Sequence, residues 1–240
     1  SSMKNDYNNI NVKTYTGKDV TPEKIKSAKE LLKNAGVDDT VVLFISGHGI
    51  HDSDKEKTYY YLTQNTDLKN LKATAADFGT IEDILAGINP RKKLFLMDTC
   101  DSGELYDLAD RKTSAYDGTG HKGIPRTPKG IVLVSDCNRG YFDKSLYIYN
   151  DLFRRTGSVV FSSSMGGEAS WEYDSLQNGA FTEAILEGLS GSADSDKNGR
   201  ITIEELQNFV SKEVVKFTEN KQHPVIDRDN ISVKFDLPVR

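Results

Sequence analysis

Two side chains able to perform nucleophilic chemistry follow two apolar segments of this sequence. His48 comes after Val41–Ile45, and Cys100 comes after Leu94–Met97. Each segment is a continuous apolar run between turn-forming residues, which is typical of a strand buried on both faces. Reactive groups collect beyond the carboxyl ends of such strands. The two side chains are 52 positions apart (100 − 48 = 52), close to the spacing of about 50 that one class of cysteine–histidine site uses.

A thiol beside an imidazole can attack a carbonyl carbon as the thiolate, while the imidazole returns a proton to the leaving group. Taken alone, each residue has a structural interpretation: Cys100 as a buried thiol and His48 as a satisfied polar group. Small residues surround both, among them Gly47, Gly49 and Gly103. Because glycines let a peptide backbone approach closely, they favour the catalytic interpretation of the pair.

Strand and helix patterns alternate along the chain and must position this pair. Strands are predicted at 10–15, 41–45, 93–97, 131–134 and 158–161. One helix is predicted to start at Thr21, its N-cap, and to end at Gly36, and others are predicted at 81–88, 146–155, 181–189 and 204–217. Buried strands that alternate with helices predict an α/β fold with three layers, a mostly parallel central sheet covered by helices on both faces. Residues 101–130 are rich in turn-forming and basic residues and predict a long mobile loop.

Composition narrows the function classes. The net charge of −5 argues against a nucleic-acid partner, which usually requires a basic surface. The chain contains no apolar run of the roughly 18 residues that a bilayer crossing needs, so no membrane partner is expected. Two cysteines are too few for a disulfide scaffold and indicate free thiols in a reducing compartment, so we expect a cytoplasmic protein. Ser1-Ser2-Met3 looks like the scar of an expression tag, so residues 1–10 are interpreted as scar and leader and 11–240 as one domain.

Several motifs resemble those of the caspase–metacaspase family of cysteine peptidases. The segments Ser46-Gly47-His48-Gly49 and Asp98-Thr99-Cys100-Asp101-Ser102-Gly103 are similar to the family's histidine and cysteine motifs, and three later segments resemble bacterial members: 179–182, 187–189 and 222–224. The resemblance implies a caspase-like three-layer sandwich and a cysteine endopeptidase that acts on polypeptides. It implies no cofactor for the chemistry itself.

The resemblance also implies residue roles. Cys100 is the expected nucleophile and His48 the expected proton donor, and the backbone N–H groups of Gly49 and Cys100 are the expected oxyanion donors, each typically worth about 3–4 kcal/mol. Asp98 and Ser46 are the expected substrate-binding residues. A carboxylate at position 98 would favour cleavage after Arg or Lys through charge-assisted hydrogen bonds. The alternative is that Asp98 only caps the turn after its strand.

The 101–130 loop offers sites for self-cleavage by an enzyme of this specificity. Its basic residues are Arg111, Lys112, Lys122, Arg126 and Lys129. Activation by autoprocessing is the hypothesis that the resemblance suggests, and a solvated basic loop is the alternative.

Residues 194–205 fit the twelve-residue EF-hand pattern. Oxygen ligands stand at the first, third and fifth positions, a glycine at the sixth and a glutamate at the twelfth. The predicted calcium ligands are Asp194, Asp196, Asn198, Arg200 through its backbone carbonyl, and Glu205. The alternative is a polar turn near a helix start, since a single loop has no partner hand.

Two other residues stand beside predicted strands. Cys137 follows the strand at 131–134 and is interpreted as a plain loop thiol rather than a groove residue. Trp171 follows the strand at 158–161 and could line the substrate site, or could simply pack on the domain.

The chain departs from the family pattern in two places. Family members usually carry an apolar strand and a helix ahead of the part that resembles residues 11–46, and without that strand Val41–Ile45 or a neighbour becomes an exposed edge. Asp101 replaces a histidine often seen after the cysteine. The alternative function is therefore a catalytically inert caspase-like module, regulatory or calcium-responsive, that works with other domains of a longer parent protein.

Overall fold

The computed structural model describes residues 7–52, 58–99, 123–125, 156–164, 168–173, 176, 178–226 and 234–239. The predicted strand at 131–134, the predicted helix at 146–155 and Cys137 lie outside these residues. So do Cys100 and the basic residues of the 101–130 loop.

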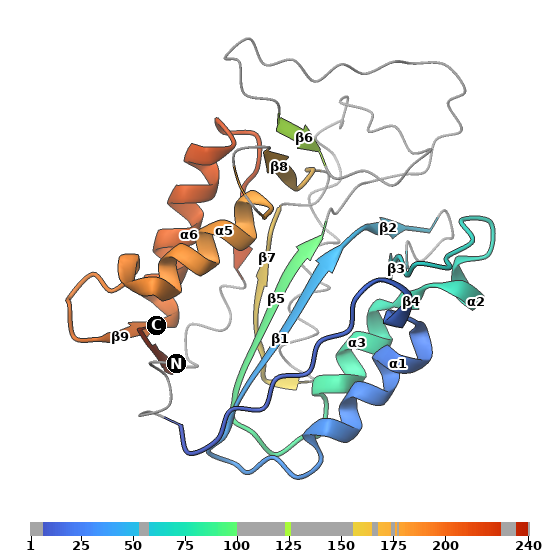
Figure 1. Ribbon diagram of the computed structural model, residues 1–240, viewed down its shortest axis with the longest axis horizontal. Coiled ribbons are helices and arrows are strands. Elements are labelled where there is room, and N and C mark those ends of the chain that lie inside the picture. Colours follow the sequence, from blue (N-terminus) through green and yellow to red (C-terminus); the bar gives the residue numbers. More distant parts are fainter. Residues whose placement is uncertain are drawn as a thin grey trace.

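The central sheet has the strand order β1-β5-β7-β10 (Figure 1). Its first three strands, β1 (Thr40–Gly47), β5 (Lys92–Thr99) and β7 (Val159–Ser162), are parallel. The short β10 (Val225–Ile226) runs antiparallel to β7. The continuous apolar runs predicted these strands correctly, because a strand covered on both faces has no polar side to present.

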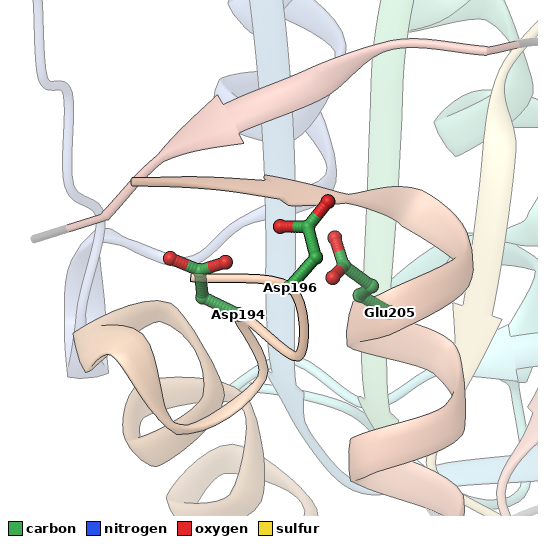
Figure 2. A group of neighbouring side chains, drawn as sticks. All are labelled: Asp194, Asp196 and Glu205. Carbon is green, nitrogen blue, oxygen red and sulfur yellow. The ribbon is translucent and has the colours of Figure 1, made fainter. Parts of the chain in front are cut away.

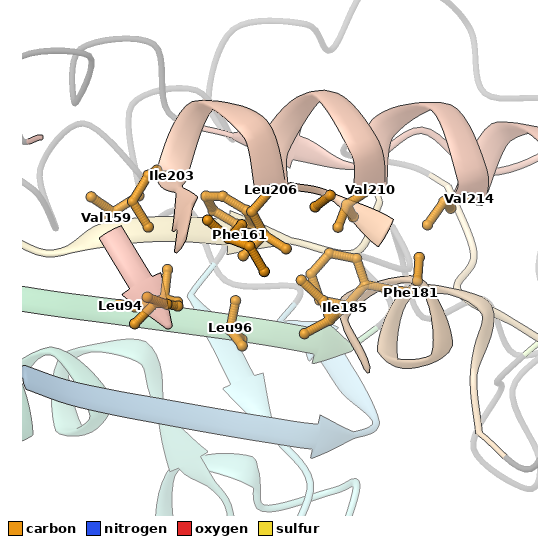
Figure 3. Close-up of a cluster of buried hydrophobic side chains, with 14 of the residues drawn as sticks. Leu94, Leu96, Val159, Phe161, Phe181, Ile185, Ile203, Leu206, Val210 and Val214 are labelled. Carbon is orange, nitrogen blue, oxygen red and sulfur yellow. The ribbon is translucent and has the colours of Figure 1, made fainter. Parts of the chain in front are cut away.

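Helices cover both faces of this sheet. On one face, α1 (Pro22–Ser27) and α3 (Phe78–Leu85) pack over side chains of β1, β5 and β7. On the other face lie α5 (Ala180–Glu187) and α6 (Ile203–Phe217). Figure 3 shows this second core, whose buried members include Leu94, Leu96, Val159, Phe161, Phe181, Ile185, Leu206, Val210 and Val214. Each such side chain contributes roughly 1.5–3 kcal/mol on burial. The predicted α/β class, with a mostly parallel sheet and helices on both faces, is confirmed.

The amino-terminal part of the chain follows the sequence pattern only in part. Thr21 caps α1 as predicted, since its hydroxyl accepts the Lys24 N–H at 3.2 Å, and a 3₁₀ helix at Ala28–Leu32 continues it. The predicted strand at 10–15 is wrong, because these residues form no strand in the structure. Alternation supplies a suitable face, but a strand also needs a partner backbone, and β1 pairs with β5 instead.

β1 lies at the edge of the described sheet, as expected for Val41–Ile45. Val41 faces the core beneath α1 and α3, whereas Val42 and Phe44 point to the opposite face and remain 51% and 45% exposed. The edge strand therefore presents two large apolar side chains to solvent.

Within the described residues, three small sheets lie around the central one. β2 (Gly49–His51), β3 (Tyr59–Tyr61) and β4 (Ala76–Asp77) form one antiparallel sheet next to a short helix, α2 (Leu71–Thr74). β9 (Arg200–Thr202) pairs with β11 (Asp236–Pro238). β6 (Gly123–Pro125) pairs with β8 (Trp171–Tyr173), so part of the predicted 101–130 loop is a strand whose distant partner gives no local signal. Within the described ranges, no helix combines the length and apolar character of a membrane span.

Candidate active site

Two neighbouring parallel strands lead into the predicted catalytic residues. The register of β1 and β5 pairs Thr40 with Lys92 and ends by pairing Gly47 with Thr99. Its offset is constant at 52 (92 − 40 = 52), the same as the separation of His48 and Cys100. His48 is the next residue after Gly47, and the described part of β5 ends one residue before Cys100.

His48 and Gly49 form the junction between β1 and β2. The His48 carbonyl accepts the Leu62 N–H at 2.8 Å, which fixes the start of the β2–β3 ladder. Gly49 is buried and stands opposite Tyr61. Because ladder hydrogen bonds alternate in an antiparallel pair, the bond at His48 leaves Gly49 at a position that does not exchange bonds with Tyr61. The Gly49 N–H therefore points away from β3.

Asp98 and Ser46 are register partners near the ends of their strands. Their side chains share one face of the sheet, since directly paired residues point the same way. Asp98 is 1% exposed, and its Oδ2 accepts a hydrogen bond from the Thr182 hydroxyl on α5. Ser46 is exposed. The structure thus places both predicted substrate-binding residues at the carboxyl edge of the central sheet. Asp98 is oriented by Thr182, which lies in the family-like segment 179–182.

A second polar network stabilises the chain beyond β7, and sequence reasoning missed it. The Ser163 hydroxyl donates to the Thr99 carbonyl at 2.9 Å. The buried Gln222 side chain donates to the Ser163 carbonyl at 2.8 Å and accepts the Trp171 N–H at 2.8 Å. The end of β5 is therefore connected to residues more than a hundred positions later in the chain. The only sequence clue was that Gln222 belongs to a segment that resembles bacterial family members.

His223, next to Gln222, also has a defined partner. Its Nδ1 lies 2.8 Å from Glu168 Oε1, and its backbone N–H donates to Glu168 Oε2 at 2.8 Å. Trp171 lies under the Lys221 ammonium group, whose nitrogen is 5.2 Å from the ring centroid. These contacts fix the segment that leads into β8 on the carboxyl side of the sheet.

The EF-hand-like loop brings three carboxylates together. Asp194, Asp196 and Glu205 each offer an oxygen, and these oxygens lie within 4.8 Å of one another (Figure 2). Gly199, at the sixth position of the pattern, has a φ of 81°, the left-handed conformation that the sharp turn requires of a glycine.

Backbone and side-chain donors already surround these carboxylates. Asp194 accepts the N–H groups of Asn198 and Gly199 at 3.1 and 2.9 Å, and Asn198 in turn accepts the Arg200 N–H at 2.8 Å. Glu205 accepts both the N–H and the hydroxyl of Ser195, at 3.0 and 2.7 Å. The Ser195 hydroxyl is the largest cause that lowers the pKa of Glu205 from 4.5 to about 2. These hydrogen bonds hold the carboxylate groups of Asp194 and Glu205 in place within the loop.

Glu205 and Arg200 also have structural roles. Glu205 forms a capping box with Thr202 at the start of α6, where its Oε2 accepts the Thr202 N–H at 3.0 Å. The Arg200 guanidinium pairs with Asp236 at 2.6 Å and lowers the pKa of that carboxyl group. Only the backbone carbonyl of Arg200 is thus a candidate ligand, as the EF-hand pattern requires.

A family model described as the caspase domain matches residues 2–236 of the chain. Among solved structures, the chain is similar to the crystal structure of protein GSU0716 from Geobacter sulfurreducens, with a TM-score of 0.51 and 18% sequence identity over 90% of this chain and 75% of that chain. A likeness at this identity concerns the fold. No curated protein matches the chain.

Proposed function

The chain belongs to the caspase-domain family, and from this premise we propose that it is a cysteine endopeptidase with His48 and Cys100 as its catalytic dyad. The observation that supports the dyad most directly is the register of β1 and β5, whose offset equals the separation of the two residues. Adjacent strands lie about 4.8 Å apart, so residues that continue this register are close enough for proton transfer after small side-chain adjustments.

The proposed reaction has two steps. The Cys100 thiolate attacks the scissile carbonyl carbon, the C–N bond breaks, and the departing amine takes a proton from the His48 imidazolium. Water then attacks the resulting thioester, with His48 as the base, and releases the acid and the free thiol. Oxyanion stabilisation is assigned to the N–H groups of Gly49 and Cys100. Support for the first comes from the direction of the Gly49 N–H, which points away from β3.

We assign substrate selection to Asp98, with Ser46 beside it. A nearly fully buried carboxylate favours a partner that brings both positive charge and several N–H donors, which is the chemistry of an arginine or lysine side chain. The preference for Arg or Lys before the cut follows from this charge.

Self-processing in the 101–130 loop is part of the same proposal, because an Arg/Lys-specific enzyme could cut after any of its five basic residues. These are Arg111, Lys112, Lys122, Arg126 and Lys129. Purified wild-type protein should become nicked after one of these residues, whereas the Cys100→Ala protein should stay intact. Nicking of the purified Cys100→Ala protein would exclude self-processing.

Calcium binding at residues 194–205 is a second proposed property, supported by the three carboxylates that meet within 4.8 Å. Asp194, Asp196, Asn198, Glu205 and the Arg200 carbonyl would hold a calcium ion, which prefers such oxygen ligands and would relieve the mutual repulsion of the anions. Calorimetric titration with calcium chloride tests this proposal.

Glu205→Gln should abolish the calcium heat, because it removes the expected bidentate ligand while an amide can still accept the capping bonds. Glu204→Gln is the matched control, since Glu204 is an exposed neighbour outside the cluster, and it should bind as the wild type does. No heat from the wild type, or equal heat from both variants, would exclude the site.

The proposed peptidase activity is tested with fluorogenic peptides that end in Arg, Lys or Asp, with Cys100→Ala as the control. Hydrolysis after Arg or Lys that vanishes in the control supports both the dyad and the role of Asp98. Hydrolysis after Asp alone would leave the dyad and overturn the role of Asp98. No hydrolysis by the wild type would favour a catalytically inert regulatory module.

A further inference from the structure

One tyrosine contacts both chain segments that lead to the proposed catalytic pair. Tyr59 lies on β3, and its ring packs directly over the backbone of Gly49 on the neighbouring strand, β2. A Cβ atom built on Gly49 would come within 1.7 Å of the Tyr59 hydroxyl oxygen. The ring therefore occupies the space that any side chain at position 49 would need. It lies directly against the residue that follows His48.

The same hydroxyl group reaches the end of β5. It lies 2.8 Å from the Thr99 hydroxyl in a buried hydrogen bond that joins residues 40 positions apart. Thr99 is the residue before Cys100, and its carbonyl group also accepts the Ser163 hydroxyl at 2.9 Å. Since a peptide unit is planar, fixing the side chain and the carbonyl of Thr99 restricts the plane of the bond that leads into position 100.

We propose that Tyr59 is a positioning residue for the catalytic pair, because its hydroxyl group connects the histidine turn of β1–β2 to the cysteine turn at the end of β5. This inference rests on the proposed function of His48 and Cys100. The ring packs against Gly49, and the hydrogen bond holds Thr99 against the ring. Together they set the distance between the two turns.

A neighbouring tyrosine supplies a matched control. Tyr61 lies on the same strand, its ring meets that of Tyr59 edge-to-face at 5.1 Å, and both rings belong to the core beneath α1 and α3. Its hydroxyl group donates to the Met97 sulfur at 2.6 Å, further from the end of β5. A hydroxyl deletion at either residue should cost similar stability, but only the one at Tyr59 releases Thr99.

The experiment compares Tyr59→Phe with Tyr61→Phe for peptide hydrolysis and for thermal unfolding. Tyr59→Phe should lower kcat by about ten- to a hundredfold with KM changed less than about threefold, because misplacement of the pair by a fraction of an ångström weakens the chemical step more than binding. Tyr61→Phe should keep kcat near the wild-type value. Thr99→Val should reproduce the loss, and the double variant Tyr59→Phe/Thr99→Val should lose no more than either alone. Equal kcat values for the two Phe variants would overturn the proposal.

A second readout separates failure of this inference from failure of the proposed function. In a Cys137→Ser background, the rate of Cys100 alkylation by iodoacetamide is measured against pH. Tyr59→Phe should shift the apparent pKa of alkylation upward, since a displaced imidazole stabilises the thiolate less, whereas Tyr61→Phe should leave it unchanged. A shift in a protein that hydrolyses no peptide would retain the positioning role and reject the peptidase. An identical profile in all three proteins would reject the positioning role.

Discussion

Gly49→Ala should disrupt the contact between β2 and Tyr59. The new Cβ would stand 1.7 Å from the Tyr59 hydroxyl oxygen and 2.3 Å from the ring carbon that bears it, far inside contact distance. Because that ring is buried, it must leave its site and break its bond to Thr99. Overpacking costs about 1–3 kcal/mol and a lost buried hydrogen bond about 1 kcal/mol, so the free energy of unfolding should fall by roughly 2–4 kcal/mol.

Thermal unfolding followed by circular dichroism measures this loss. For a chain of this size each kcal/mol lowers Tm by about 2–4 °C, so a fall of roughly 4–16 °C is expected. Gly79→Ala in α3 is the control, since its Cβ would meet nothing nearer than an Asp77 carboxylate oxygen at 3.5 Å. A helical Gly-to-Ala change should leave Tm unchanged or raise it slightly.

A double variant isolates the clash itself. In Gly49→Ala/Tyr59→Ala the ring is gone, so the two changes together should destabilise the protein by about 1–3 kcal/mol less than the sum of the single changes. Strict additivity, or a Gly49→Ala protein as stable as Gly79→Ala, would refute the reasoning.

Three further changes test other parts of the structure. Gln222→Leu should lower the free energy of unfolding in urea by about 2–5 kcal/mol, because it leaves the Ser163 carbonyl and the Trp171 N–H buried without their partner; an unchanged midpoint would contradict this. The pKa of Glu205 is depressed to about 2, so the stability that its carboxylate contributes is complete above pH 4.5 and is lost as the pH falls toward 2. After solvent screening this contribution amounts to about 1 kcal/mol. Glu205→Gln should therefore make Tm depend less on pH below 4.5, and Tm-versus-pH curves that run parallel for the two proteins would exclude this contribution. Phe44→Lys should reduce self-association in analytical ultracentrifugation at unchanged Tm, since Phe44 is 45% exposed on an edge strand, and a large fall in Tm would show that this face is covered.

The sequence predicted the elements whose pattern is local. β1 and β5 are continuous apolar runs that a two-sided sheet requires. Their register, which pairs Ser46 with Asp98, comes from the structure. The helix predicted at 204–217 forms one residue earlier, at Ile203, because Thr202 and Glu205 build a capping box there. These predictions depend on neighbours within a few positions, which is the range that periodicity and capping describe.

The contacts that the sequence did not reveal join distant positions. Tyr59 and Tyr61 stand in a run of consecutive tyrosines with no alternation, so nothing local shows that one face of β3 meets the end of β5. Gln222 bonds to Ser163 across 59 positions, and its polar side chain gives no local hint that it is buried. Such pairings follow from the topology of the sheet, which brings the ends of β5 and β7 together only after the chain has folded.

Covalent labelling tests the proposed dyad most directly. Wild-type protein is incubated with a peptidyl-arginine acyloxymethyl ketone, and intact-mass and peptide-mapping spectra locate the adduct. The dyad predicts one adduct per chain, on Cys100, absent in Cys100→Ala, slowed by at least about a hundredfold in His48→Ala, and unaffected in Cys137→Ser. An adduct on Cys137, or labelling of Cys100 at the same rate without His48, would contradict the assignment.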